Sequence, residues 1–148
     1  MSEQTSLEIK ECVTDAEIQS IYNFNTNAFA DMQDFEWNTE ELKSQIAAGW
    51  TLLSVSVNKD IVAAIFIKIV DKTLYTKNTA IKMEYQGNGF SHLIKEFYEE
   101  LASEKAIDRI INYCAQDNFR MISLNEGHDY VKTGNNTTAN IIEWEKVI

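Results

Sequence analysis

Hydrophobic positions along the chain follow two spacings, one typical of β-strands and one typical of α-helices. Strand-like runs, in which apolar residues alternate with polar ones or follow one another directly, are predicted at 7–13, 50–57, 61–70, 74–83, 107–114, 130–132 and 140–147. Helix-like runs, with apolar residues three and four positions apart, are predicted from 14 or 15 to about 29 and at 39–49, 91–105 and 118–126. This order of elements predicts an α+β protein.

The connections between these elements predict a mixed sheet. Residues 58–60, Asn-Lys-Asp, separate two strand-like runs and are typical of a hairpin, which joins antiparallel strands. The helix at 91–105 instead lies between two strands, and such a crossover makes them parallel. The 148 residues, 45% of them hydrophobic, suffice for one core, and neither a repeat nor an internal linker interrupts them. We therefore expect a single domain over residues 1–148.

The segment at 86–91, Gln-Gly-Asn-Gly-Phe-Ser, joins a predicted strand to a predicted helix. Its glycines allow a tight turn with successive N–H groups, and the helix adds its own unpaired amides and the positive end of its dipole. Such a place can bind phosphate, although the same glycines can also form a simple turn. The segment is not a P-loop, because no Gly-Lys-Ser/Thr follows, and it lacks the three spaced glycines of a dinucleotide fold.

Charge and composition limit the classes of partner that the protein is expected to bind. The formal net charge is −10, and the first 48 residues hold ten acidic and two basic side chains. Nucleic-acid binding depends on cationic contacts to phosphate, so we expect no nucleic-acid partner. The acidic surface either attracts a cationic partner or only keeps the domain soluble, and net charge does not decide between these alternatives.

Neither a membrane segment nor a metal site is expected. No apolar run approaches the roughly 18 residues of a membrane span, and the N-terminus lacks a signal pattern, so the sequence predicts a cytoplasmic protein. Cys12 and Cys114 lie far apart and are expected to be buried free thiols. His92 and His128 are also too far apart in sequence, with too few neighbouring ligands, to predict a metal site.

Two motifs resemble those of the GNAT superfamily of acyl-CoA-dependent N-acyltransferases. Gln86–Ser91 is similar to the family's pyrophosphate motif, Arg/Gln-x-x-Gly-x-Gly/Ala, with Ser91 in the last place and Tyr85 before it. Residues 118–126 are similar to the later motif Asn-x-x-Met-x-x-x-Asn-Glu, and the order of predicted elements also matches. The resemblance implies the GNAT fold, a mixed sheet flanked by helices on both faces, with acetyl-CoA as the co-substrate and no metal.

The resemblance also implies a set of residues that bind coenzyme A (CoA). Backbone amides of the glycine loop would hold the pyrophosphate, the edge of the preceding strand would pair with the peptide-like pantetheine arm, and Asn118 would contact the pantetheine end. In this fold that strand splays from the next one, which leaves its backbone groups unpaired. The implied residues are Ile81, Lys82, Met83, Gln86, Gly87, Asn88, Gly89, Phe90, Ser91 and Asn118.

The usual acid–base groups of the family are missing. Asn125 stands where many members have a tyrosine that protonates the departing thiolate, and an amide cannot supply that proton. Tyr75 stands near the place of a glutamate base. The catalytic residues are therefore unknown, and the weak candidates are Asn125 itself, Tyr130 and Glu84, with Tyr113, Ser123 or a water as further proton donors.

The loop at 31–38 lines the acceptor pocket in the family. Its carboxylates could hold a cationic amine while its aromatic rings add a cation–π face; these residues are Asp31, Asp34, Glu36, Phe35 and Trp37. We expect acetyl transfer to a primary amine of a small molecule or peptide by direct attack, in a monomer or homodimer. The alternatives are a non-catalytic acyl-CoA sensor and an acidic interaction module that keeps only the fold.

Overall fold

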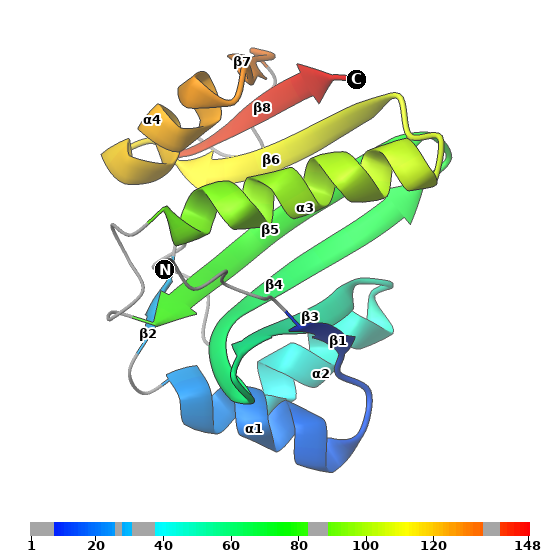
Figure 1. Cartoon of the computed structure of the whole chain (residues 1–148), viewed down its shortest axis with the longest axis vertical. Helices are drawn as coiled ribbons and strands as arrows, with labels where there is room; N and C mark the ends of the chain where they lie inside the picture. Colours follow the sequence, from blue (N-terminus) through cyan, green and yellow to red (C-terminus); the bar gives the residue numbers. More distant parts are fainter. Residues whose placement is uncertain (1–7, 26–27, 31–37, 83–88, 135–139) are drawn as a thin grey trace, which may run out of the picture. The chain divides into compact units, whose positions relative to one another are not determined.

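The computed structural model describes residues 8–25, 28–30, 38–82, 89–134 and 140–148 (Figure 1). Its elements in chain order are β1 (Glu8–Glu11), α1 (Asp15–Asn25), β2 (Ala28–Ala30), α2 (Thr39–Ala47), β3 (Thr51–Val57), β4 (Asp60–Val70), β5 (Thr73–Lys82), α3 (Phe90–Glu104), β6 (Arg109–Ala115), α4 (Phe119–Gly127), β7 (Val131–Lys132) and β8 (Ile141–Val147). The chain forms two compact units, residues 1–66 with 78–85 and residues 67–77 with 86–148. Strands β4 and β5 run through both.

The strands form a mixed sheet, as predicted. Their hydrogen-bonded order is β1-β3-β4-β5-β6-β8-β7, and β2 pairs with β5 outside this path. β5 and β6 are parallel, whereas the pairs β1–β3, β6–β8, β7–β8 and β2–β5 are antiparallel. The α3 crossover explains the one parallel pair among these.

In the first unit, the two helices α1 and α2 pack against each other, and α2 packs against β3. Apolar residues spaced three or four apart place Ile18 and Ile21 of α1 and Leu42 of α2 in one cluster with strand residues. The buried members of this cluster are Cys12, Ile18, Ile21, Leu42, Leu52, Ala64 and Phe66. The expected burial of Cys12 is confirmed.

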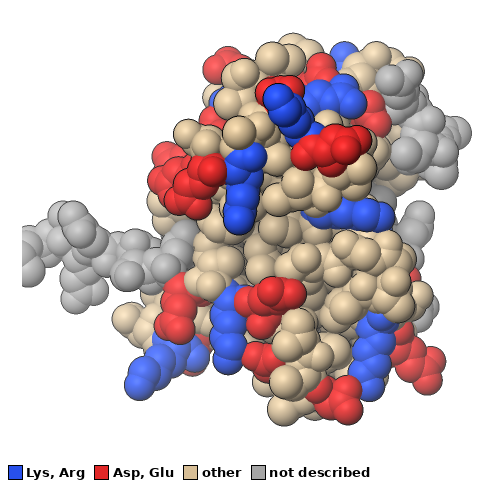
Figure 2. All heavy atoms as spheres, turned by 90° about the vertical axis from the view of Figure 1, so that its right-hand side faces the viewer, with Lys and Arg blue, Asp and Glu red and all other residues tan. Residues whose placement is uncertain are grey.

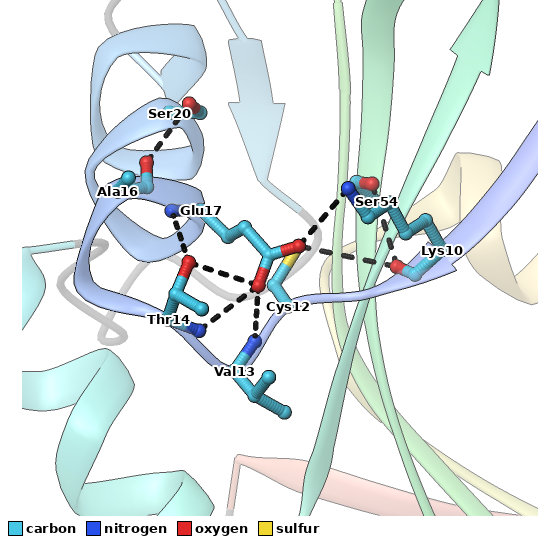
Figure 3. Close-up of polar contacts among 8 residues, drawn as sticks. All are labelled: Lys10, Cys12, Val13, Thr14, Ala16, Glu17, Ser20 and Ser54. Atoms are coloured by element: carbon cyan, nitrogen blue, oxygen red, sulfur yellow. Dashed lines mark hydrogen bonds and ion pairs between the residues drawn. The ribbon is translucent and has the colours of Figure 1, made fainter.

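A capping box begins α1 (Figure 3). The Glu17 carboxylate accepts hydrogen bonds from the backbone N–H groups of Thr14 at 2.9 Å and Val13 at 3.1 Å, while the Thr14 hydroxyl accepts one from the N–H of Glu17 at 3.2 Å. Lys10 lies 3.1 Å from the same carboxylate. These donors, the Thr14 amide first, lower the pKa of Glu17 to about 2.

This capping box predicts a pH-dependent part of the stability. Because the pKa of Glu17 is lower in the folded state than its ordinary value of 4.5, its contribution is complete above pH 4.5 and is lost as the pH falls towards 2. We expect urea unfolding to show a stability difference between the wild type and Glu17→Gln at pH 6 that shrinks between pH 4.5 and 2. The exposed Ser20→Ala, in the same helix, is the control. A difference that stays constant over this range would contradict the prediction.

In the second unit, α3 and α4 cover the same face of the sheet. Figure 1 shows α3 lying along β6, and the two elements are in contact. The side chain of Asn125 in α4 bonds to Asn112 of β6, and Lys146 of β8, which shares the face of Asn112 by register, is paired with Glu99 of α3. Cys114 on this face of β6 is buried, as expected.

The predicted first helix is too long. We expected it to reach about residue 29, but α1 ends at Asn25, and Ala28–Ala30 forms β2. Residues 23–27 include three asparagines, whose side chains compete for backbone hydrogen bonds and disfavour helix interiors. The apolar residues that follow therefore belong to a strand.

Charged side chains of both signs lie next to one another on the face drawn in Figure 2. Ion pairs in the described part of the chain include Lys43 with Asp15 at 3.1 Å and Arg109 with Glu145 at 2.6 Å. Pairs of this kind are exposed and contribute little to stability. The mixture of blue and red side chains in Figure 2 shows that this face is not uniformly acidic.

Candidate functional site

The start of α3 differs from the start of the other three helices. Side chains cap α1 through Thr14, α2 through Asn38 and α4 through Asn118. The N-cap of α3 is Gly89, which has no side chain to offer, and the first turn of α3 contains no acidic residue. Among the described residues, α3 is therefore the only helix whose positive end has neither a side-chain cap nor an acidic residue in the first turn.

Gly89 adopts a conformation that suits its residue type. Its φ of 77° and ψ of 2° lie in the left-handed region, which glycine enters at little cost. Its carbonyl accepts hydrogen bonds from the N–H of His92 at 3.1 Å and of Leu93 at 3.4 Å. The helical ladder thus begins at His92, and the amides of Gly89, Phe90 and Ser91 lie ahead of it.

The space around Gly89 is open. Among the described residues, a Cβ atom built on Gly89 would meet no heavy atom within 4 Å outside its chain neighbours. On the side that this Cβ would occupy, the described residues leave room for an anion near the first turn of α3. Of the other predicted loop residues, Ser91 is half-buried in the first turn, whereas Gln86, Gly87 and Asn88 lie outside the described residues.

The predicted strand edge is already paired. Among the described residues, β5 pairs with β6 over Thr73–Thr76, and beyond this ladder Ala80–Lys82 pairs antiparallel with Ala28–Ala30 of β2. The expectation that the backbone at Ile81 and Lys82 lacks a protein partner is therefore wrong. The contact of Ile81, Lys82 and Met83 with CoA stays a prediction, and Met83 lies outside the described residues.

Asn118, the other predicted CoA contact, caps α4. Its Oδ1 accepts a hydrogen bond from the N–H of Met121 at 3.1 Å, and the side chain is half-buried. The cap positions Asn118 at the end of the loop that follows β6. Its contact with CoA stays a prediction.

A buried polar network connects the helices of the second unit to the sheet. Lys95 of α3 donates to Asn125 Oδ1 at 2.7 Å, and Asn125 Nδ2 donates to Asn112 Oδ1 at 3.1 Å. Asn112 in turn donates to the Thr76 hydroxyl at 3.2 Å, which donates to the carbonyl of Ile111 at 3.1 Å. The four polar side chains are at most 2% exposed. Each bond satisfies a group that would otherwise be costly to bury.

This network gives Asn125 a structural role. Both ends of its amide are engaged by protein groups, and its side chain is fully buried. An amide also has no acidic proton to give to a thiolate. Asn125 thus connects α4 to α3 and β6, and its correspondence with the tyrosine of the GNAT superfamily stays a prediction.

Tyr130 and Tyr113 are weak acids here. Tyr130 is buried with its ring 4.2 Å from Lys95 Nζ, and its hydroxyl has no hydrogen-bond partner among the described residues. Burial raises the pKa of Tyr130, and burial together with the Glu143 carboxylate raises the pKa of Tyr113 to about 12. A good proton donor has a pKa near that of the group it serves, and a thiol has a pKa of about 8.5. Neither phenol meets this condition.

Two histidines far apart in sequence form a pair. His92 Nδ1, in the first turn of α3, lies 2.7 Å from His128 Nε2, at the end of α4. His128 Nδ1 lies 3.7 Å from the Glu99 carboxylate, which also pairs with Lys146. Burial, opposed by Glu99, lowers the pKa of His128. At least one of the two imidazole rings must be neutral to form this hydrogen bond, because two imidazolium rings would both be donors.

For the remaining predicted site residues, the structure gives no evidence of a role in the site. Glu84 and the acceptor-loop residues lie outside the described residues; the latter are Asp31, Asp34, Phe35, Glu36 and Trp37. Their roles stay predictions. Tyr75, near the place of the family's glutamate, is half-buried on β5. Ser123 is exposed on α4.

The described residues form neither a metal-binding cluster nor a helix that could span a membrane. Within the ranges that the structure describes, no three His, Cys, Asp or Glu side chains gather in a way that could hold a metal ion. No helix in these ranges is both long and apolar enough to cross a membrane.

Sequence reasoning missed the buried lysine and the histidine pair. A signal for Lys95 was present, because it lies three residues before Tyr98 and seven before Ala102, on the apolar face of α3. A lysine on such a face is rarely buried without a specific contact. For the pair of His92 and His128, which depends on how α4 returns to α3, the sequence carried no signal.

Solved structures similar to this chain are acetyltransferases. The ribosomal-protein-S18-alanine N-acetyltransferase of Escherichia coli matches with a TM-score of 0.76 at 15% identity, over 97% of this chain and 94% of that one. The PaiA N-acetyltransferase of Thermoplasma acidophilum, in complex with CoA, matches with a TM-score of 0.73 at 14% identity, over 97% and 99%. A GNAT family acetyltransferase of Elizabethkingia anophelis with acetyl-CoA bound matches with a TM-score of 0.72 at 14% identity, over 96% and 98%.

At these identities the matches show the fold. The mixed sheet with four helices is that of the GNAT acetyltransferases, which confirms the fold predicted from the two motifs. No protein-family model and no curated protein matches the sequence itself.

Proposed function

This chain has the fold of the GNAT acetyltransferases, and from that premise we propose that it transfers an acyl group, in the simplest case acetyl, from CoA to a primary amine. The observation that carries the proposal is the start of α3. There Gly89, in the left-handed region and open to solvent, precedes a helix end without a side-chain cap or first-turn acid. Such an end suits a pyrophosphate.

The proposed reaction is direct attack within a ternary complex. The neutral nitrogen of the amine forms a bond to the thioester carbonyl carbon, the carbon–sulfur bond breaks, and the thiolate leaves with its electron pair. Because a thiolate of pKa about 8.5 needs little acid help, we propose that water protonates it rather than Asn125 or Tyr130. The amine nitrogen releases a proton to solvent or to a base such as Glu84.

The acceptor is proposed to be a cationic small molecule or peptide amine, held by the segment at 31–37. The carboxylates of Asp31, Asp34 and Glu36 and the ring of Trp37 provide groups that recognise an ammonium. We also propose that the protein is cytoplasmic and that residues 1–148 form a single domain.

One observation favours a second candidate. Asn125 replaces the tyrosine of the family and is fully engaged in a buried network. A non-catalytic protein that binds acyl-CoA as a sensor would need the loop at 86–91 but no proton donor.

We expect acetyl-CoA to raise the thermal midpoint. At a concentration about 100 times Kd, binding stabilises the folded state by about 2.7 kcal/mol, which for a chain of this size raises Tm by about 5–10 °C. Pantetheine, which lacks the pyrophosphate, is the matched control and should give little shift. The absence of any shift at millimolar acetyl-CoA would remove both the enzyme and the sensor.

Release of the CoA thiol then separates enzyme from sensor. We would follow it with DTNB across a panel of small amines and peptides; Cys12 and Cys114 are both buried, so the background is low. Turnover with one acceptor class supports the enzyme. Tight acetyl-CoA binding with no thiol release on any amine would favour the sensor.

A further inference from the structure

The short strand β2 lies against the last residues of β5 (Figure 1). The register is antiparallel, with Ala28 opposite Lys82, Phe29 opposite Ile81 and Ala30 opposite Ala80. All of these residues belong to the first unit. β5 has β4 as its neighbour on one edge and β6 on the other, and its pairing with β6 ends at Thr76. β2 thus pairs with the end of β5, beyond the Thr73–Thr76 ladder.

We propose that β2 is an autoinhibitory strand, which occupies the backbone edge of β5 needed by the pantetheine arm of CoA and must leave before CoA binds. This inference rests on the proposed function, because the edge has a competing ligand only if the chain binds CoA. It assigns to Ala28–Ala30 a role in regulating that site.

The competition follows from the chemistry of the two partners. A strand edge presents backbone N–H and C=O groups, and a peptide strand or an amide-containing ligand pairs with them in the same way. The pantetheine arm carries two amides, so it resembles a short stretch of extended peptide. Ala80–Lys82 cannot pair with both on one edge, and binding of one excludes the other.

The pairing is short enough to be reversible. β2 has three residues, and each backbone hydrogen bond adds only modestly to stability once exchange with water is counted. A ligand that binds only the open state has an apparent Kd equal to its intrinsic Kd divided by the open fraction. We expect the open state to be about one tenth of the population, which weakens CoA binding about tenfold.

A disulfide across the register tests the proposal. Ala30→Cys with Ala80→Cys joins two residues that lie directly opposite, at a spacing that a disulfide can span. Oxidation should lower CoA affinity by about 100-fold or more, and reduction should restore it. The matched control is Glu8→Cys with Ser56→Cys, which makes the same cross-link between β1 and β3 and should leave CoA affinity unchanged.

A second variant should have the opposite effect and release β2 from β5. Proline at Ala28 and Ala30 removes two N–H donors and is disfavoured within a ladder, so CoA should bind about tenfold more tightly. Hydrogen exchange on the wild type gives an independent readout. With CoA bound, the amides of Ala28–Ala30 should exchange faster while those of Ala80–Lys82 stay protected.

These outcomes separate the inference from the proposed function. If the oxidised 30–80 variant binds CoA as tightly as the reduced one, or the proline variant binds no more tightly than the wild type, β2 does not compete and the inference is overturned while the CoA site stands. If CoA fails to bind the wild type and the reduced variant alike, the proposed function falls, and the inference falls with it. If the amide hydrogens of Ala28–Ala30 still exchange slowly when CoA is bound, the inference is also overturned.

Discussion

Gly89→Asp should weaken CoA binding by about 100-fold or more. The new carboxylate would lie at the start of α3, where an anionic pyrophosphate is proposed to sit, and two like charges a few ångströms apart near a surface repel by several kcal/mol. The open space around Gly89 means that the side chain should not clash with the protein. The measurement is the Tm shift and titration with acetyl-CoA.

Two controls isolate the charge. Gly89→Asn has nearly the same shape and tolerates the left-handed region as well as Asp does, so it should lose far less affinity. Gly134→Asp places the same residue at a second open glycine with a φ of 85°, outside the proposed site, and should retain wild-type CoA binding. If Gly89→Asp binds CoA as well as Gly89→Asn does, the pyrophosphate is not held at this helix end.

Asn125→Leu should lower the free energy of unfolding by about 2–4 kcal/mol. Leucine is similar in size but offers no polar atom, so Lys95 loses its acceptor at 2.7 Å and Asn112 loses its donor at 3.1 Å, both in a region excluded from water. Urea unfolding at neutral pH measures the change.

Two further variants serve as comparisons for this measurement. Glu126→Leu changes an exposed residue of the same helix and should shift stability by no more than about 0.5 kcal/mol. Asn125→Asp keeps an acceptor for Lys95 but loses the donor to Asn112, so its stability should fall between those of wild type and Asn125→Leu. Wild-type stability of Asn125→Leu would show that the network does not hold α4 in place.

Most of the fold followed from hydrophobic spacing. The apolar runs at 50–57 and 61–70 and the hairpin residues between them predicted β3 and β4, and the stripe of apolar residues at 91–105 predicted α3 within one residue of its start. β3 and β4 are buried on both faces over 52–55 and 62–67, as continuous apolar runs predict, whereas α3 buries one stripe. The parallel pairing of β5 with β6 followed from the crossover.

What spacing could not predict depends on partners distant in the chain. β2 has three residues, too few for a pattern, and it exists because β5 offers it an edge. The predicted CoA loop is visible in the sequence because glycine is needed there, as the φ of Gly89 bears out. The network around Lys95 and Asn125 requires four elements to meet, and no local signal names all of its members.

The capping pattern of the helices implies a division of labour between stability and ligand binding. Three helices use a Thr or Asn side chain to satisfy their first amides, and their ends are finished without any ligand. At Gly89 the protein forgoes that stabilisation, which relative to glycine amounts to roughly a few tenths of a kcal/mol. The φ of 77° already favours glycine at position 89, so the informative feature is the missing side-chain cap rather than the glycine itself. A start of α3 that lacks a side-chain cap across related sequences would therefore mark a helix end that is kept incomplete for its ligand.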